Sequence, residues 1–138
     1  MRSVRLAAVT VLVLALCCSA CGGSKERIHS LRAVEAAFSA AGAPFQGEWQ
    51  PNPYLASGGS PRGELPKALG PHLVGLASTI NSSTFKGGQA WVFDTQASAV
   101  AYADLCRRRC GALIRADNVV YTGTASAAAS KAMARLKG

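Results

Sequence analysis

The 138-residue sequence is poor in acidic residues and in histidine, which supply much of the acid–base chemistry of enzymes. Its seven Asp and Glu residues are scattered, and His29 and His72 lie far apart in the chain. It contains no Gly-x-Ser-x-Gly pattern of serine hydrolases, no Gly-Lys-Ser/Thr phosphate loop and no Gly-x-Gly-x-x-Gly dinucleotide pattern. We therefore expect no enzymatic activity, no cofactor and no metal site.

Charged residues are also few, at 16%, whereas hydrophobic residues make up 49% of the chain. Disordered chains combine low hydrophobicity with high charge, so this composition excludes a wholly disordered protein. The length leaves no room for two domains with separate cores. The balance of charge is basic, with 15 Lys and Arg against 7 Asp and Glu and a formal charge of +8.

Long hydrophobic runs are absent as well. The apolar segment from Leu6 to Leu16 is too short to cross a bilayer, which takes about 20 residues. Arg2 and Arg5 precede this segment, and the small residues Ser19 and Ala20 end it. A positive start, a short apolar run and a small-residue exit are typical of a secretory signal, which predicts that residues 1–20 are removed. An uncleaved membrane anchor is the alternative.

The residues Ser19-Ala20-Cys21, followed by two glycines, resemble the lipobox of bacterial lipoproteins. In that family the cysteine carries a diacylglycerol thioether and becomes the first residue. The resemblance implies a lipid on Cys21, a tether over 21–29 and a domain held at the extracytoplasmic face of the cell membrane. Two acyl chains anchor a protein stably where one is marginal. The alternative is ordinary secretion with a free Cys21; Cys17 and Cys18 match the pattern less well.

If Cys21 carries lipid, Cys106 and Cys110 are the only other cysteines of the processed chain. An even pair in an oxidising compartment predicts a disulfide. Helical neighbours four apart have Cβ atoms about 5–6 Å apart, whereas a disulfide needs about 3.8 Å, so the bond should end or distort the helix. A redox-active pair is the alternative. The familiar redox motif, however, has Cys-x-x-Cys at the start of a helix rather than Cys-x-x-x-Cys at its end.

The densest charge is the run Arg107, Arg108 and Arg109. Cations are favoured at a helix C-terminus, so a solvated helix end explains this run without any function. The other interpretation is an anion patch, because each Lys or Arg near an anionic membrane contributes about 1 kcal/mol. An extracytoplasmic location argues against nucleic acid as a partner and leaves an envelope protein or a small ligand.

Hydrophobic periodicity and turn residues predict the elements of the domain. Helices are expected over 31–41, 96–109 and 125–136, strands over 43–50, 73–81 and 89–94, and a hairpin over 112–122. A Pro- and Gly-rich stretch over 51–71 is expected to be an irregular loop. The expected helix N-caps are Ser30 (or Ser24), Asp94 or Thr95, and Thr124 or Ser126. We predict a single α+β domain over 30–138, a small two-layer fold with a short antiparallel sheet and about three helices.

The same patterns predict which side chains face the core. In the strand over 73–81 they are Val74, Leu76 and Ile80, and in the next strand Trp91 or Phe93. In the helix over 96–109 the expected core face is Ala97, Ala101 and Leu105, flanked by Val100. In the last helix it is Ala129, Ala132, Met133 and Leu136.

The segments GGQAWVFDTQASAVAYADL and LIRADNVVYTG resemble small lipoproteins of high-GC Gram-positive bacteria. This resemblance implies a location and a fold rather than an activity. We therefore expect a non-enzymatic, membrane-anchored extracytoplasmic lipoprotein that serves as a binding or envelope-interaction module. The alternatives are a thiol-redox or envelope stress protein using Cys106 and Cys110, and a small hydrolase whose residues come together only in the fold.

Overall fold

A computed structural model of the chain describes residues 25–50, 65–79, 87–124 and 126–138. The expected signal segment, Cys21, Ile80 and residues 51–64 of the Pro- and Gly-rich stretch lie outside the described residues. The elements in chain order are α1 (Leu31–Ala40), β1 (Gln46–Gln50), the short 3-10 helix η1 (Gly70–His72), β2 (Leu73–Thr79), β3 (Gly88–Phe93), α3 (Gln96–Cys106), β4 (Ala112–Ala116), β5 (Val119–Gly123) and α4 (Ala127–Lys137).

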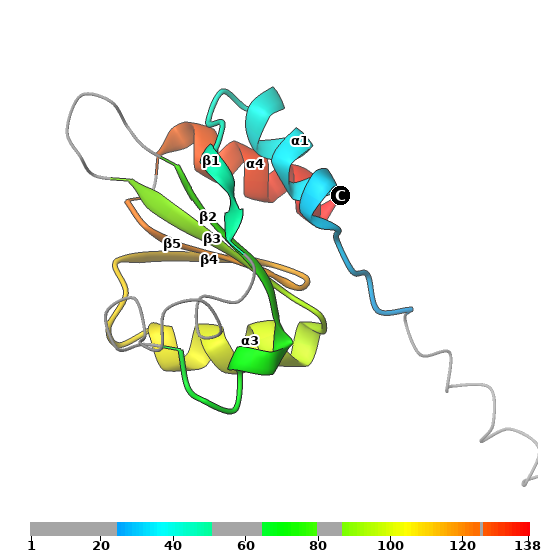
Figure 1. Cartoon of the computed structure of the whole chain (residues 1–138). Coiled ribbons are helices and arrows are strands. Elements are labelled where there is room, and N and C mark those ends of the chain that lie inside the picture. Colours follow the sequence, from blue (N-terminus) through cyan, green and yellow to red (C-terminus); the bar gives the residue numbers. More distant parts are fainter. Residues whose placement is uncertain (1–24, 51–64, 80–86, 125) are drawn as a thin grey trace, which may run out of the picture.

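The strands form one antiparallel sheet with the order β1-β2-β3-β5-β4. The predicted small α+β domain is thereby confirmed. The layering differs from the prediction, because α1 and α4 cover one face of the sheet and α3 covers the other (Figure 1). The cause lies in β3, where every residue from Ala90 to Phe93 is buried. A strand that is apolar on both faces needs a helix on each side, so the fold has three layers instead of two.

The first core lies between the sheet and the helices α1 and α4. Val34 and Phe38 of α1 meet Ala132 and Met133 of α4 over Tyr121 of β5. Both helices begin at a predicted cap: the side chains of Ser30 and Ser126 accept hydrogen bonds from backbone N–H groups three residues later. The face predicted for α4 is the one that is buried.

The second core lies between the sheet and α3. Trp91 and Phe93 of β3 point toward this helix, and their ring centroids lie 4.8 and 5.3 Å from the ring of Tyr102. The prediction for the face of α3 was wrong. Ala97, Val100, Ala101 and Leu105 are exposed, and the buried residues are Ser98, Ala99, Tyr102, Ala103 and Cys106.

Strand β2 departs from simple alternation at its start. Val74 is exposed, although it was predicted to share the core face with Leu76. The pairing register between β2 and β3 shifts between Leu73 and Gly75. Such a bulge breaks the two-residue period, so Leu73 and Leu76 lie in the same core and Val74 faces outward.

Candidate functional site at the disulfide end of helix α3

Cys106 and Cys110 form the predicted disulfide, with their Cα atoms 5.1 Å apart. Helix α3 ends at Cys106, three residues earlier than predicted. The backbone N–H of Cys110 still donates to the carbonyl of Cys106, so the chain makes one further turn before it enters β4. Cys106 is buried in the second core, and Cys110 packs against its edge. The bridge therefore fastens the end of α3 to the start of β4.

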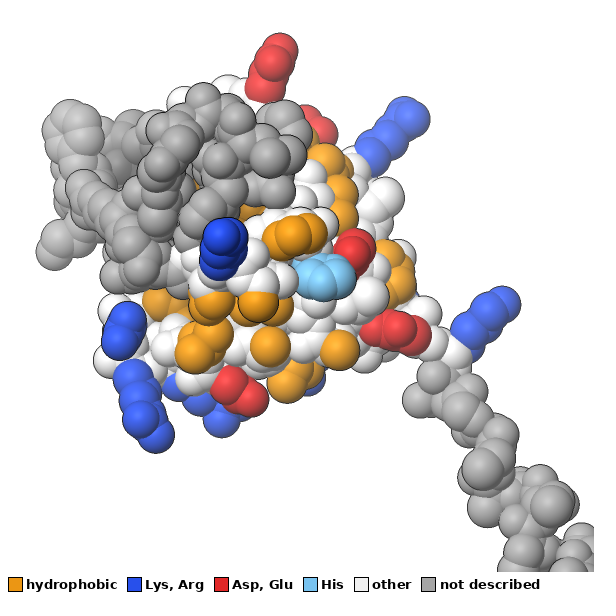
Figure 2. Space-filling model, turned by 60° about the horizontal axis from the view of Figure 1, so that its bottom comes forward, with side chains coloured by type: hydrophobic (Ala, Val, Ile, Leu, Met, Phe, Trp, Pro, Cys, Tyr) orange, Lys and Arg blue, Asp and Glu red, His pale blue; other side chains and the backbone are white. Residues whose placement is uncertain are grey.

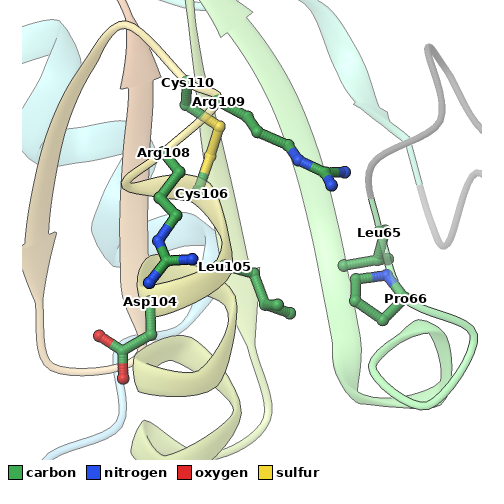
Figure 3. A pocket seen from close by; sticks show the side chains of 8 residues that line it. All are labelled: Leu65, Pro66, Asp104, Leu105, Cys106, Arg108, Arg109 and Cys110. Atoms are coloured by element: carbon green, nitrogen blue, oxygen red, sulfur yellow. A yellow bond between two sulfur atoms is a disulfide. The ribbon is translucent and has the colours of Figure 1, made fainter.

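A cavity of about 480 Å³ lies beside this disulfide (Figure 3). One wall is the end of α3 and the turn that follows it. The other is the segment at 65–66, which belongs to the described end of the expected irregular loop. The lining residues are Leu65, Pro66, Asp104, Leu105, Cys106, Arg108, Arg109 and Cys110.

Two of the three consecutive arginines border the cavity. The side chain of Arg109 extends toward Leu65 and Pro66, and that of Arg108 runs back along α3 toward Asp104 (Figure 3). Arg107 instead pairs with Asp104, with 3.5 Å between nitrogen and oxygen. Both partners of that pair are mostly exposed, so it adds little to stability. The cavity thus combines two guanidinium groups with an apolar wall, a combination suited to a small anion that carries an apolar part.

Sequence reasoning missed a second cluster, which holds residues 25–30 (the N-terminal strap) against the sheet. Asn118, expected only as a turn residue, is fully buried. Its amide nitrogen donates to the carbonyls of His29 and Phe93 at 3.0 and 2.7 Å, and its amide oxygen accepts from the N–H of His29 at 2.7 Å. The side chain of one hairpin residue therefore ties the strap to the end of β3.

The strap continues from there to the N-terminus of α3. The backbone N–H of Gln96 donates to the carboxylate of Glu26, and the side-chain amide of Gln96 donates to the carbonyl of Arg27 at 3.0 Å. Residues 26–29, expected to be part of a tether, thus contact the domain. Glu26, near the start of the strap, thus lies beside the first turn of α3.

Each of the two histidines pairs with a carboxylate. His29 Nε2 lies 2.9 Å from Asp117, and His72 Nδ1 lies 2.9 Å from Asp94. Thr95 is the N-cap of α3, since its side chain accepts from the N–H of Ser98. Of the two predicted alternatives, Thr95 is therefore correct. The two histidine–carboxylate pairs join separate segments of the fold. His29 and Asp117 link the strap to the β4–β5 hairpin, and His72 and Asp94 link η1 to the start of α3. Both pairs therefore have a structural role.

The chain matches no protein-family model, no curated protein and no solved structure. Within residues 25–50, 65–79, 87–124 and 126–138, no group of three or more His, Cys, Asp or Glu side chains is arranged to hold a metal ion. None of the helices described there is both long enough and apolar enough to pass through a membrane.

Proposed function

We propose that the protein is a membrane-anchored extracytoplasmic lipoprotein, held by a diacylated Cys21, whose domain binds a small anionic ligand without catalysing a reaction. The observation that carries the binding part is the cavity at the end of α3, with Arg108 and Arg109 opposite the apolar Leu65 and Pro66. Guanidinium groups bind carboxylates, sulfonates and phosphates through paired hydrogen bonds, and the apolar wall accommodates the rest of such a ligand.

Two further observations support the location. The residues around Cys21 resemble a lipobox. The Cys106–Cys110 disulfide suits an oxidising compartment, because disulfides persist outside the cytosol and are rare within it. The strap begins four residues after Cys21 and is hydrogen-bonded to the folded domain. A lipid on Cys21 would therefore hold the domain close to the membrane surface.

Binding of an anionic aromatic probe, 8-anilinonaphthalene-1-sulfonate, tests the cavity. We expect the double variant Arg108→Gln, Arg109→Gln to bind the sulfonate at least about tenfold more weakly, because the loss of even one charge-assisted hydrogen bond costs about 1.5 kcal/mol or more. The control Lys131→Gln, Arg135→Gln removes the same amount of charge from the exposed side of α4, outside the cavity lining, so it should leave the affinity within about twofold. Isothermal titration gives the three affinities. Equal weakening by control and double variant would mean that the probe senses only net charge.

A thiol-redox protein using Cys106 and Cys110 is the second candidate, because the disulfide itself lines the cavity. Against it, Cys106 is buried, and the bridge follows the C-terminal end of α3, where the helix dipole does not stabilise a thiolate.

We expect this disulfide to be structural, with a reduction potential below about −300 mV. Replacing both cysteines by alanine should lower the free energy of unfolding by about 2 kcal/mol, since the closed loop is short. Equilibration with dithiol buffers measures the potential. A value near that of thioredoxin, about −270 mV or higher, would favour the redox function instead.

A further inference from the structure

The outer face of α3 carries an apolar row that no described element covers. Ala97, Val100, Ala101 and Leu105 follow one another at helical spacing and are all exposed, with 39% of Val100 and 51% of Leu105 accessible. Figure 2, which looks onto this side of the molecule, shows hydrophobic side chains gathered over the helix, with Lys and Arg side chains toward one end. In a domain this small, an apolar row of this kind on a surface helix indicates a contact surface.

Positive charge continues the row at its C-terminal end. Arg107, Arg108 and Arg109 follow the helix directly and are exposed, and the one carboxylate within α3, that of Asp104, is paired with Arg107. Two arginines therefore remain in excess at the C-terminal end of the helix. An apolar row joined to basic residues is the pattern by which helices lie on anionic membrane surfaces.

The strap limits how far the predicted anchor can lie from α3. The carboxylate of Glu26 binds the first N–H of α3, and Cys21 lies five residues before Glu26. Five residues span at most about 17 Å, which is close to the length of this 11-residue helix, about 16 Å. A lipid on Cys21 therefore holds the N-terminus of α3 within one helix length of the bilayer. The strap also reaches the C-terminal end of α4, where the guanidinium of Arg27 donates to the carbonyl of Lys137 at 3.2 Å. The apolar residues decide between the two helices, because Val100 and Leu105 of α3 are exposed whereas α4, on the other face of the sheet (Figure 1), exposes no large hydrophobic side chain.

We infer that the exposed face of α3 docks onto the surface of an anionic lipid bilayer, with Val100 and Leu105 entering the headgroup region and the arginines after the helix binding lipid phosphates. This inference rests on the proposed lipid anchor and adds an orientation to it: α3 faces the membrane, and α1 and α4 face away. The binding cavity, which shares Leu105, Arg108 and Arg109 with this face, then opens at the membrane surface.

Quenching of tryptophan fluorescence by brominated acyl chains tests the orientation. The full chain, extracted from membranes, is reconstituted into vesicles of phosphatidylglycerol with brominated phosphatidylcholine. We expect a tryptophan at position 105, in Leu105→Trp, to be quenched at least about twofold more than one at position 134 of α4, in Ala134→Trp. Both positions are exposed, so both variants should fold, and Val100→Trp provides a second reporter on the same face. The signal of the wild-type chain, with Trp49 and Trp91, is subtracted.

Vesicles of phosphatidylcholine alone, and anionic vesicles at high salt, should reduce the difference because both weaken the attraction to arginine. Equal quenching at positions 105 and 134 would overturn the docking inference. Burial of position 105 by self-association in detergent would also overturn it, since a second copy would then cover α3. The intact mass of the same sample reports the acyl chains separately, so failure of the anchor is distinguishable from failure of the docking.

Discussion

Replacing Tyr102 by alanine is expected to lower the free energy of unfolding by about 4 kcal/mol. Its side chain is 2% exposed and packs against both Trp91 and Phe93 in the second core. Truncation removes these ring contacts and leaves a cavity that the rigid sheet cannot close. Urea unfolding followed by circular dichroism measures the loss.

The matched control is Leu105→Ala, three residues further along the same helix. Leu105 is half exposed, so its truncation should change stability by no more than about 0.5 kcal/mol. The pair of variants tests which face of α3 is buried. A large loss at Leu105 with a small loss at Tyr102 would restore the face predicted from the sequence and remove the proposed docking surface.

Replacing Asn118 by leucine is expected to destabilise the fold by about 3 kcal/mol. Leucine has nearly the same size but offers no donor or acceptor, so the N–H and C=O of His29 and the C=O of Phe93 lose their side-chain partner. Leaving buried polar groups unpaired costs about 1–3 kcal/mol each, and release of the strap to water offsets part of this sum.

Amide hydrogen exchange and a control variant accompany the stability measurement on Asn118→Leu. Amide hydrogen exchange should rise at His29 because the strap is released, and Ser130→Ala, an exposed change on α4, should leave both stability and exchange nearly unaltered. Unchanged protection of His29 in Asn118→Leu would show that other contacts hold the strap. The position of Cys21 relative to α3 would then need a different explanation.

Much of the fold is predictable because local signals and tertiary packing agree. In α1 and α4 the large apolar residues fall on one side only, and the caps Ser30 and Ser126 have the expected side chains. The turn residues at 117–118 likewise mark the β4–β5 hairpin, where Asp117 has the positive φ of 50° that turns of this kind require.

Helix α3 shows where periodicity fails. Alanine, valine and leucine occur all round this helix, so hydrophobicity alone does not single out a buried side. The outcome is decided by Tyr102, whose ring completes a cluster with Trp91 and Phe93. The buried side of α3 therefore depends on β3, which is apolar on both faces and needs a helix on each side. A strand bulge similarly turned Val74 outward. Gly75, at the register shift, is the signal that could have indicated it, because an isolated glycine within a strand often marks a bulge.

The candidate site was predictable in part. The Cys106–Cys110 disulfide was predictable, because the number of cysteines in the processed chain and an oxidising compartment are enough to predict it. The cavity was not predictable, since Leu65 and Arg109 lie on opposite walls but far apart in the chain. The role of Asn118 was not predictable either, because asparagine is a common turn residue and its burial depends on the strap that crosses it.

The intact mass of the protein extracted from membranes without reductant tests the proposed lipid anchor most directly. We expect the mass of residues 21–138 plus a diacylglyceryl group and any further acyl chain on the new amino terminus, rising by two hydrogen atoms when the disulfide is reduced. Cys21→Ser should lose the acylated species, whereas Cys17→Ser should keep it. A mass of residues 21–138 without acyl chains, or of the unprocessed chain, would contradict the lipid anchor.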